Sequence, residues 1–292
     1  MSFSIFTDTS ANIPTPTAKE NHIGVIPLSY IADGQEHICL DTEQFHCQEY
    51  YKSLKDGARI TTSQINPDRY EQYMEEAVRE GQDILFIGMS SGISGSFNSA
   101  RVAAEQLQEA YPERKFRLVD SLGASLGEGL LVYEALRCRE QGMSLDETAD
   151  YLDDKRHHVY QLFTVDDLMF LRRGGRLSNA SALVGTILNV KPLLKGNEHG
   201  KIVSFEKVRG RKRVLEQIAS RYEKLVVEPE NQTVYMSQCD CPEDAALLAQ
   251  MLRRSRPPKE ILMVEHEPVT GSYLGPGALC VYFVGDRDVR TK

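Results

Sequence analysis

The chain has 292 residues, which is enough for two domains that each bury a core of their own. Its composition, 41% hydrophobic and 26% charged residues, is ordinary for a globular protein. No apolar run approaches the roughly 20 residues that a membrane span needs, so stable membrane insertion is not expected. The net charge of −8 argues against nucleic acid as the main partner. The N-terminal residues lack a signal-peptide pattern, and we therefore expect a cytoplasmic protein.

Apolar runs of strand length alternate with helical patterns in the first half of the chain. The predicted strands are 4–7, 23–31, 84–89 and 117–119, and the predicted helices are 42–55, 67–79, 97–110, 126–140 and 145–155. Pro67 suits the first turn of a helix, and Ser144 with Glu147 forms the pattern of a capping box. This alternation predicts an α/β domain with a mainly parallel sheet and helices on both faces.

The second half predicts another α/β domain, with helices and a mixed sheet. Its predicted strands are 160–163, 202–208, 233–236, 261–264 and 279–284, and its predicted helices are 165–173, 180–188, 213–225 and 243–253. The character of the sequence changes after the charged stretch 153–158. We therefore expect one domain at residues 1–157 and a second at residues 158–292.

Small hydroxyl residues cluster where the strands of the first domain are predicted to end. The four clusters are Thr7-Asp8-Thr9-Ser10, Thr61-Thr62-Ser63-Gln64, Ser90 to Ser96, and Asp120-Ser121. Loops after parallel strands gather at one edge of a sheet, so we expect several clusters to converge there. Each cluster taken alone could equally cap the helix that follows it. Four together, two of them longer than a cap requires, favour a binding site.

The turn from Ser90 to Ser96 offers hydroxyls and backbone N–H groups at a predicted helix N-terminus, which suits a carboxylate or phosphate. Between Met89 and Arg101 there is no His, Cys, Asp or Glu, so the turn is equipped to hold an anion rather than to transform one. Ser94 lies in Gly92-Ile93-Ser94-Gly95-Ser96, where a nucleophile elbow would need glycine in place of Ser96. Catalysis by Ser94 with a distant base remains an alternative.

No cofactor or metal is predicted. The chain lacks the G-x-x-x-x-G-K-[ST] phosphate loop, and the glycines at 123–129 have the wrong spacing for a dinucleotide fingerprint. None of the six cysteines forms a C-x-x-C pair, and His37, Cys39, His46 and Cys47 are more simply free thiols and surface histidines than metal ligands.

Two further segments are distinctive. Arg172, Arg173 and Arg176 precede or flank a glycine pair, and Arg209 begins another basic group, in a chain that is acidic as a whole. These arginines could simply be a solvated face, but positive charge against an acidic background favours an anionic group or an acidic partner. The run 275–277, Gly-Pro-Gly, is a structural turn or a ligand-facing loop.

Together these segments resemble the DegV family, in the family's order along nearly the whole chain. The matching segments are Thr7-Asp8-Thr9-Ser10 (T-D-S), Thr62-Ser63-Gln64 (T-S-Q-P, with Ile65 in place of proline), Ser90 to Ala100 (S-S-x-L-S-G-T-Y-x-S-A), Asp120-Ser121, Gly174-Gly175-Arg176-Leu177-Ser178 and Gly275-Pro276-Gly277-Ala278-Leu279. The resemblance implies two α/β domains with a fatty acid buried between them. It also implies a carrier without catalytic residues, which presents the acyl carboxylate to a separate ATP-binding kinase subunit for acyl-phosphate formation.

The resemblance also implies which residues hold the ligand. Thr62 and Ser94 correspond to the family's carboxylate contacts, and Tyr273 stands where a histidine usually provides a third. A second family histidine is replaced by Gln238. To the ligand contacts we add Ser63, Gly95 and Ser121, which lie in the hydroxyl clusters described above, and we assign partner docking to Arg172, Arg173, Arg176 and Arg209. Apolar candidates for the acyl tunnel, each of which could equally be plain core, are Ile93, Phe97, Leu183, Ile187 and Leu188.

Two other functions stay open. One is a serine-dependent acyl hydrolase or transferase that uses Ser94. The other is a regulatory lipid sensor that needs no kinase.

Overall fold

The computed structural model describes residues 3–178 and 189–292, and the chain divides into two compact units. The first unit comprises residues 1–45 and 60–156, and the second comprises residues 46–59 and 157–292. The predicted helix 180–188 and three of the tunnel candidates, Leu183, Ile187 and Leu188, lie outside the described residues.

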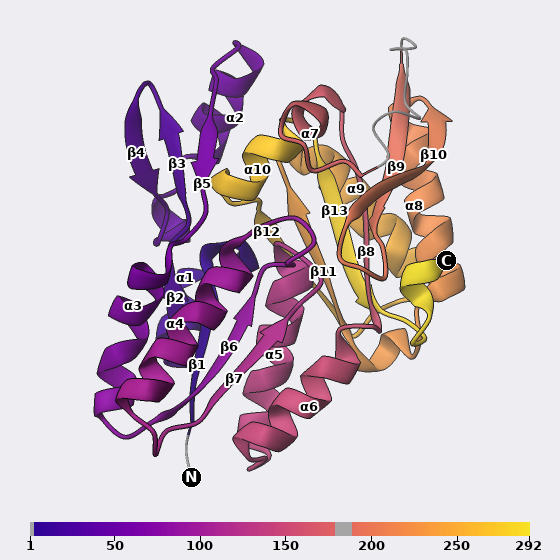
Figure 1. Cartoon of the computed structure of the whole chain (residues 1–292). Helices are drawn as coiled ribbons and strands as arrows, with labels where there is room; N and C mark the ends of the chain where they lie inside the picture. Colours follow the sequence, from indigo (N-terminus) through magenta and orange to yellow (C-terminus); the bar gives the residue numbers. More distant parts are fainter. Residues whose placement is uncertain (1–2, 179–188) are drawn as a thin grey trace. The chain divides into compact units, whose positions relative to one another are not determined.

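The first unit is built on a four-stranded parallel sheet of order β2-β1-β6-β7. Its strands are β1 (Phe3–Asp8), β2 (Gly24–Ile26), β6 (Asp83–Gly88) and β7 (Phe116–Asp120), and its helices are α1 (Thr15–Glu20), α3 (Pro67–Arg79), α4 (Ser96–Ala110), α5 (Leu126–Glu140) and α6 (Leu145–Lys155). Helices α3 and α4 pack together on one face of the sheet, and α5 and α6 pack together on the other (Figure 1). This confirms the predicted parallel sheet with helices on both faces.

Apolar residues and helix caps explain these elements. Phe86 of β6 is fully buried, and its ring lies 5.3 Å from that of Tyr70 on α3 and 6.4 Å from that of Phe97 on α4. Asn66 caps α3 by accepting a hydrogen bond from the Arg69 backbone, and Pro67 occupies the first turn as predicted. The predicted capping box of Ser144 and Glu147 begins α6.

The prediction of one long strand at 23–31 is wrong. The structure has β2, followed by β3 (Ser29–Ala32), which belongs to a separate antiparallel sheet with β4 (Gln35–Ile38) and β5 (Thr61–Ser63). Pro27 interrupts the run, since it has no N–H to donate, and the Leu28 N–H bonds the Thr9 hydroxyl at 3.0 Å instead of a neighbouring strand.

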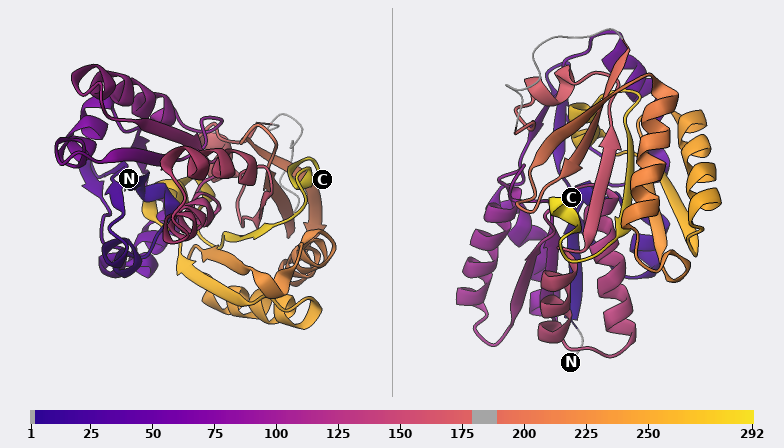
Figure 2. Two further views of the ribbon diagram at one scale, coloured as in Figure 1. Left: turned by 90° about the horizontal axis from the view of Figure 1, so that it is seen from below. Right: turned by 90° about the vertical axis from the view of Figure 1, so that its right-hand side faces the viewer.

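The second unit is a six-stranded mixed sheet of order β10-β9-β8-β13-β11-β12, in which the β11–β12 pairing is parallel and the others are antiparallel. Its strands are β8 (Val159–Thr164), β9 (Val190–Gly196), β10 (Ile202–Arg209), β11 (Thr233–Gln238), β12 (Glu260–Glu265) and β13 (Leu279–Val284), and its helices are α2 (Cys47–Lys55), α7 (Met169–Arg173), α8 (Arg211–Leu225), α9 (Pro242–Ser255) and α10 (Pro268–Leu274). Helices α8 and α9 lie side by side along one face (Figure 2). The mixed sheet with helices is confirmed.

A single apolar core joins this sheet to α8 and α9. Phe283 of β13 is fully buried, and its ring makes edge contacts with Tyr160 at 5.5 Å and Tyr222 at 5.3 Å. The predicted helix 165–173 is shorter in the structure, because the Asp167 side chain accepts the Met169 N–H and helix α7 begins only there.

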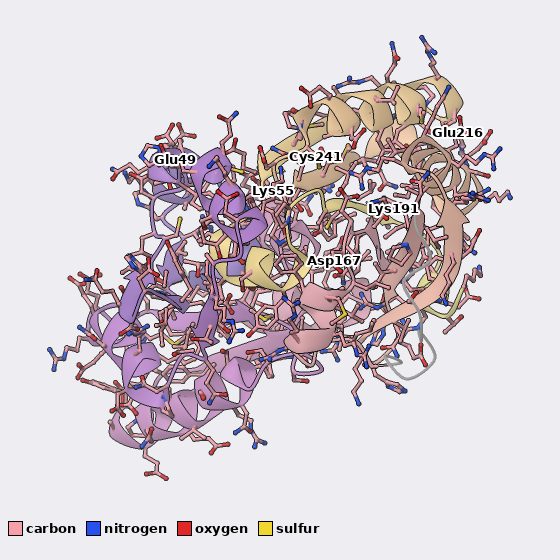
Figure 3. All side chains as sticks on the ribbon, turned by 90° about the horizontal axis from the view of Figure 1, so that it is seen from above. Glu49, Lys55, Asp167, Lys191, Glu216 and Cys241 are labelled. Atoms are coloured by element: carbon pink, nitrogen blue, oxygen red, sulfur yellow. The ribbon has the colours of Figure 1, made fainter. Side chains whose placement is uncertain are left out.

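The stretch 46–59 was predicted to be part of the first domain but groups with the second unit. Its helix α2 is fixed by the hydroxyl of Tyr50, which donates to the Pro268 carbonyl (2.6 Å), and by that of Tyr51, which donates to the His266 carbonyl (2.8 Å). Lys55 forms an ion pair with Asp240 (2.8 Å), beside Cys241 (Figure 3). The predicted helix 42–55 is accordingly broken before residue 47.

Candidate functional site

The turn that connects β6 to α4 is folded by its own hydroxyls. The Ser94 hydroxyl donates to the Ser96 hydroxyl (3.0 Å) and accepts the Ser96 N–H (3.1 Å), while the Ser90 hydroxyl accepts the Gly92 N–H (3.1 Å). Helix α4 has Gly95 at its N-cap and no side-chain cap, and Ser94 is half-buried. The turn therefore places a hydroxyl at the partly positive end of a helix of 15 residues.

The end of strand β5 lies against this turn. The Ile65 N–H donates to the Ser96 hydroxyl (3.2 Å), and a Cβ atom added to Gly95 would lie 2.3 Å from the Gln64 side-chain oxygen. Thr62 and Ser63 precede these residues on β5 and are half-buried. Two of the four predicted hydroxyl clusters thus meet, with the Gln64 side chain lying against Gly95.

The Asp120-Ser121 cluster meets the same turn from β7. The Ser91 hydroxyl donates to the Asp120 carboxylate (2.5 Å), and the Ser90 N–H donates to the Gly123 carbonyl (2.8 Å). Ser121 is fully buried and exchanges hydrogen bonds with the Gly123 backbone at 3.2 and 3.1 Å. Its hydroxyl thus serves its own turn, and its contact with a ligand stays a prediction.

The fourth cluster, at the end of β1, is held by two buried carboxylates. Asp8 accepts the N–H groups of Ser10 (2.8 Å) and Met89 (3.2 Å), and burial raises the pKa of Asp8. Thr7 and Ser10 donate their hydroxyls to Glu128, at 2.9 Å in the case of Thr7. This cluster therefore builds the edge of the sheet and connects it to the Ser90 turn.

Sequence reasoning missed Glu128, which is fully buried at the start of α5. The spacing from Ser125 to Glu128 is that of a capping box and would have drawn attention to it. In the structure Ser125 makes no side-chain cap and has a φ of 51°, and the Glu128 carboxylate faces β1 instead. Only the long-range contacts show that role.

Tyr273 belongs to the second unit, on helix α10. Its ring lies 4.5 Å from the Arg176 guanidinium, a cation–π contact. A Cβ atom on Gly174 would lie 2.2 Å from the same ring, so the absence of a side chain there lets the tyrosine pack against the end of α7. Tyr273 is half-buried.

The predicted docking arginines differ in their surroundings. Arg172 and Arg173 are exposed at the end of α7, and Arg209 is exposed at the end of β10. Arg176 is half-buried against Tyr273 and donates to the Gly174 carbonyl.

Asp166 connects the segments that carry these arginines. Its carboxylate pairs with Lys191 of β9 (2.7 Å) and with Arg211 of α8 (3.3 Å). Arg209 lies two residues before Arg211 and opposite Val190 in the sheet register.

The other predicted residues have structural partners. The Gln238 side chain accepts the Cys241 N–H (2.5 Å) before α9, and Phe97 packs on Phe86. In the described ranges 3–178 and 189–292, no group of three or more His, Cys, Asp and Glu side chains could hold a metal ion. Over the same residues, no helix is long and apolar enough to cross a membrane.

Comparison with known proteins decides the family. The model of the family described as "Uncharacterised protein, DegV family" matches residues 2–286. The chain belongs to the DegV family. A DegV domain-containing protein of Clostridium perfringens is 38% identical over 284 residues, which cover 97% of this chain and 98% of that protein.

Solved structures of other DegV proteins share the fold. A DegV family protein from Thermus thermophilus, described by its fatty acid binding, has a TM-score of 0.89 and 30% identity, and the match covers 98% of this chain and 100% of that one. DegV from Bacillus subtilis, described as a fatty acid binding protein, has a TM-score of 0.84 and 27% identity over 98% of this chain and 100% of its own. The two predicted α/β domains are those of this family.

Proposed function

We propose that this DegV protein binds a long-chain fatty acid and acts as a carrier rather than as an enzyme. The observation that carries the proposal is the convergence of hydroxyl clusters on the N-terminus of α4, where the N-cap residue Gly95 has no side chain to cap the helix. The fatty acid binding named for the relatives from T. thermophilus and B. subtilis supports it. Native mass spectrometry of freshly purified protein is expected to reveal a co-purified fatty acid.

The carboxylate is held, in this proposal, by the hydroxyls of Thr62 and Ser94, with Ser63 and the Gly95 backbone beside them. Hydrogen bonds to an ionised group are stronger than those between neutral groups, at about 1.5–3 kcal/mol each. The acyl chain supplies most of the affinity, since each buried methylene contributes ~0.8 kcal/mol. The hydroxyl clusters then orient the head group.

A serine hydrolase is the weaker alternative. In the described part of the chain no histidine is hydrogen-bonded to Ser94, whose hydroxyl bonds Ser96 instead. Turnover of an acyl ester that Ser94→Ala abolishes would contradict the carrier proposal.

We expect Tyr273 to donate its O–H to the carboxylate as a neutral group. An ordinary phenol titrates near pH 10 and a histidine near pH 6.5. Tyr273→Phe removes the O–H donor and should weaken fatty acid binding several-fold. Tyr273→His should introduce a dependence of the Kd on pH between about 6 and 8, because histidine titrates in that range. Isothermal titration with palmitic acid at several pH values measures both effects. A Tyr273→Phe variant with parental affinity and chain-length preference would contradict the role.

We further propose that the protein presents the carboxylate to a separate ATP-binding kinase subunit, and that the exposed Arg172, Arg173 and Arg209 dock that partner. Arg172→Glu with Arg173→Glu should abolish acyl-phosphate formation in a reconstituted kinase reaction and leave palmitic acid binding unchanged. The pair Arg253→Glu and Arg254→Glu, two arginines in the last turn of α9, is the matched control. Equal loss with both pairs would show a general charge effect, and full activity in all variants would show that these arginines do not dock the kinase. A parent protein that supports no acyl-phosphate formation would favour a lipid sensor without a kinase.

A further inference from the structure

A series of polar side chains crosses the second unit from the sheet to helix α10. The hydroxyls of Tyr282 and Ser237 are 3.2 Å apart, and the Ser237 hydroxyl lies 2.9 Å from Nδ1 of His266. Nε2 of His266 lies 2.8 Å from the Thr270 hydroxyl, which donates to the Glu267 carboxylate. We call these five residues the polar series; all are buried except Thr270, which is half-buried.

The direction of every hydrogen bond in the polar series follows from its last member. Both oxygens of Glu267 accept N–H groups of α10, from Val269 (2.6 Å) and Thr270 (2.7 Å), as an N-capping carboxylate does. The Thr270 hydroxyl gives its only proton to Glu267, so its oxygen must accept from His266. The imidazole therefore carries its proton on Nε2.

The remaining hydrogen bonds of the polar series have their directions set by this protonated Nε2. With Nε2 protonated, Nδ1 is an acceptor and takes the proton of Ser237, and Ser237 accepts from Tyr282. His266 has only 2% of its surface exposed, and burial lowers its pKa to about 3, so the ring stays neutral. Both ring nitrogens are hydrogen-bonded: Nδ1 to Ser237 on strand β11 and Nε2 to Thr270 on helix α10.

Helix α10 carries Tyr273 three residues after Thr270. The ring of Tyr273 packs against Arg176 and Gly174. The polar series and the end of α7 thus both contact the same short helix. Because α10 has only seven residues, its own hydrogen bonds give it little rigidity.

We infer that His266 is a positioning residue for the fatty acid head group: its neutral ring holds α10 so that Tyr273 points its hydroxyl at the carboxylate. This inference rests on the proposed function. His266 itself touches no ligand in this account and acts through Thr270 and the helix.

The test compares ligands with and without a carboxylate. Palmitic acid and 1-hexadecanol are titrated into delipidated parent, His266→Leu, His266→Gln and Thr270→Val. Thr270→Val keeps the shape of the side chain and removes the hydrogen bond between His266 and α10. If His266→Leu does not fold, Thr270→Val takes its place in the comparison. We expect His266→Leu and Thr270→Val to weaken palmitic acid roughly tenfold and hexadecanol less than twofold. His266→Gln, which keeps one donor and one acceptor, should recover most of the affinity.

Two further measurements separate positioning from general loosening. In a Tyr273→Phe background, Thr270→Val should cause no additional loss of palmitic acid affinity, because both changes remove the same contact. The 15N shifts of the His266 ring should report the Nε2–H tautomer, with or without ligand. Equal losses for acid and alcohol, additive losses in the double variant, or the opposite tautomer would overturn the inference. A parent protein that binds neither ligand would instead overturn the proposed function.

Discussion

Ser94→Ala is expected to weaken the binding of palmitic acid roughly tenfold or more without unfolding the protein. The substitution removes a hydroxyl at the N-terminus of α4 that would turn from Ser96 and donate its proton to the carboxylate. A hydrogen bond to a charged group contributes about 1.5–3 kcal/mol. Thr62→Val, which keeps the shape of the side chain, should lower the affinity for palmitic acid by a similar factor. Titration calorimetry measures the affinities, and thermal unfolding reports the fold.

Ser91→Ala is the matched control for this pair. It removes a hydroxyl from the same turn, but one that bonds Asp120. Its palmitic acid affinity should therefore stay within about twofold of the parent, well below the loss expected for a charged hydrogen bond. If Ser94→Ala and Thr62→Val both bind as the parent does, these residues do not form the head-group site.

Acid is expected to destabilise the second unit through His266. Burial lowers the pKa of His266 to about 3 in the folded protein, against about 6.5 in an unfolded chain. The stability that the neutral ring contributes is fully present above pH 6.5 and is lost as the pH falls toward 3, since only the unfolded chain binds the proton there. The free energy of unfolding should fall by about 1.4 kcal/mol per pH unit in this window from His266 alone.

Urea unfolding of the parent and of His266→Gln between pH 7 and 4 isolates this contribution. The variant cannot titrate at this position, so its stability should depend on pH by about one proton less than that of the parent. His199→Gln is the control, because the side chain of His199 is 73% exposed. It should retain the parental slope, and a His266→Gln variant with that same slope would show that the ring is not held neutral.

Two helices with local cap signals were predicted to the residue. Helices α3 and α6 begin and end as expected because Asn66, Pro67, Ser144 and Glu147 act on their own helix termini. The strand at 23–31 failed where Pro27 sends the chain into another sheet. That pairing depends on β3 meeting β5, whose paired residues lie about thirty positions later in the chain.

The candidate site likewise has parts that the sequence pattern predicts and parts that depend on long-range contacts. Ser94 and the Asp120-Ser121 turn follow parallel strands, as predicted from the way such turns gather at one edge of a sheet, whereas Thr62 lies within β5 of the separate antiparallel sheet. The contact of these residues with a ligand stays a prediction. Glu128 and the grouping of α2 with the second unit could not be predicted, since they depend on side-chain contacts over long sequence separations, such as Thr7 with Glu128 and Tyr51 with His266. The resemblance to the DegV family supplied the ligand class, which composition and spacing alone did not.

Titration of the delipidated protein with long-chain fatty acids tests the central claim most directly. We expect saturable binding of one fatty acid per chain, with the corresponding alcohol bound more weakly because it lacks the carboxylate that Thr62 and Ser94 would hold. No saturable binding of palmitic, stearic or oleic acid by a folded, delipidated protein would contradict it.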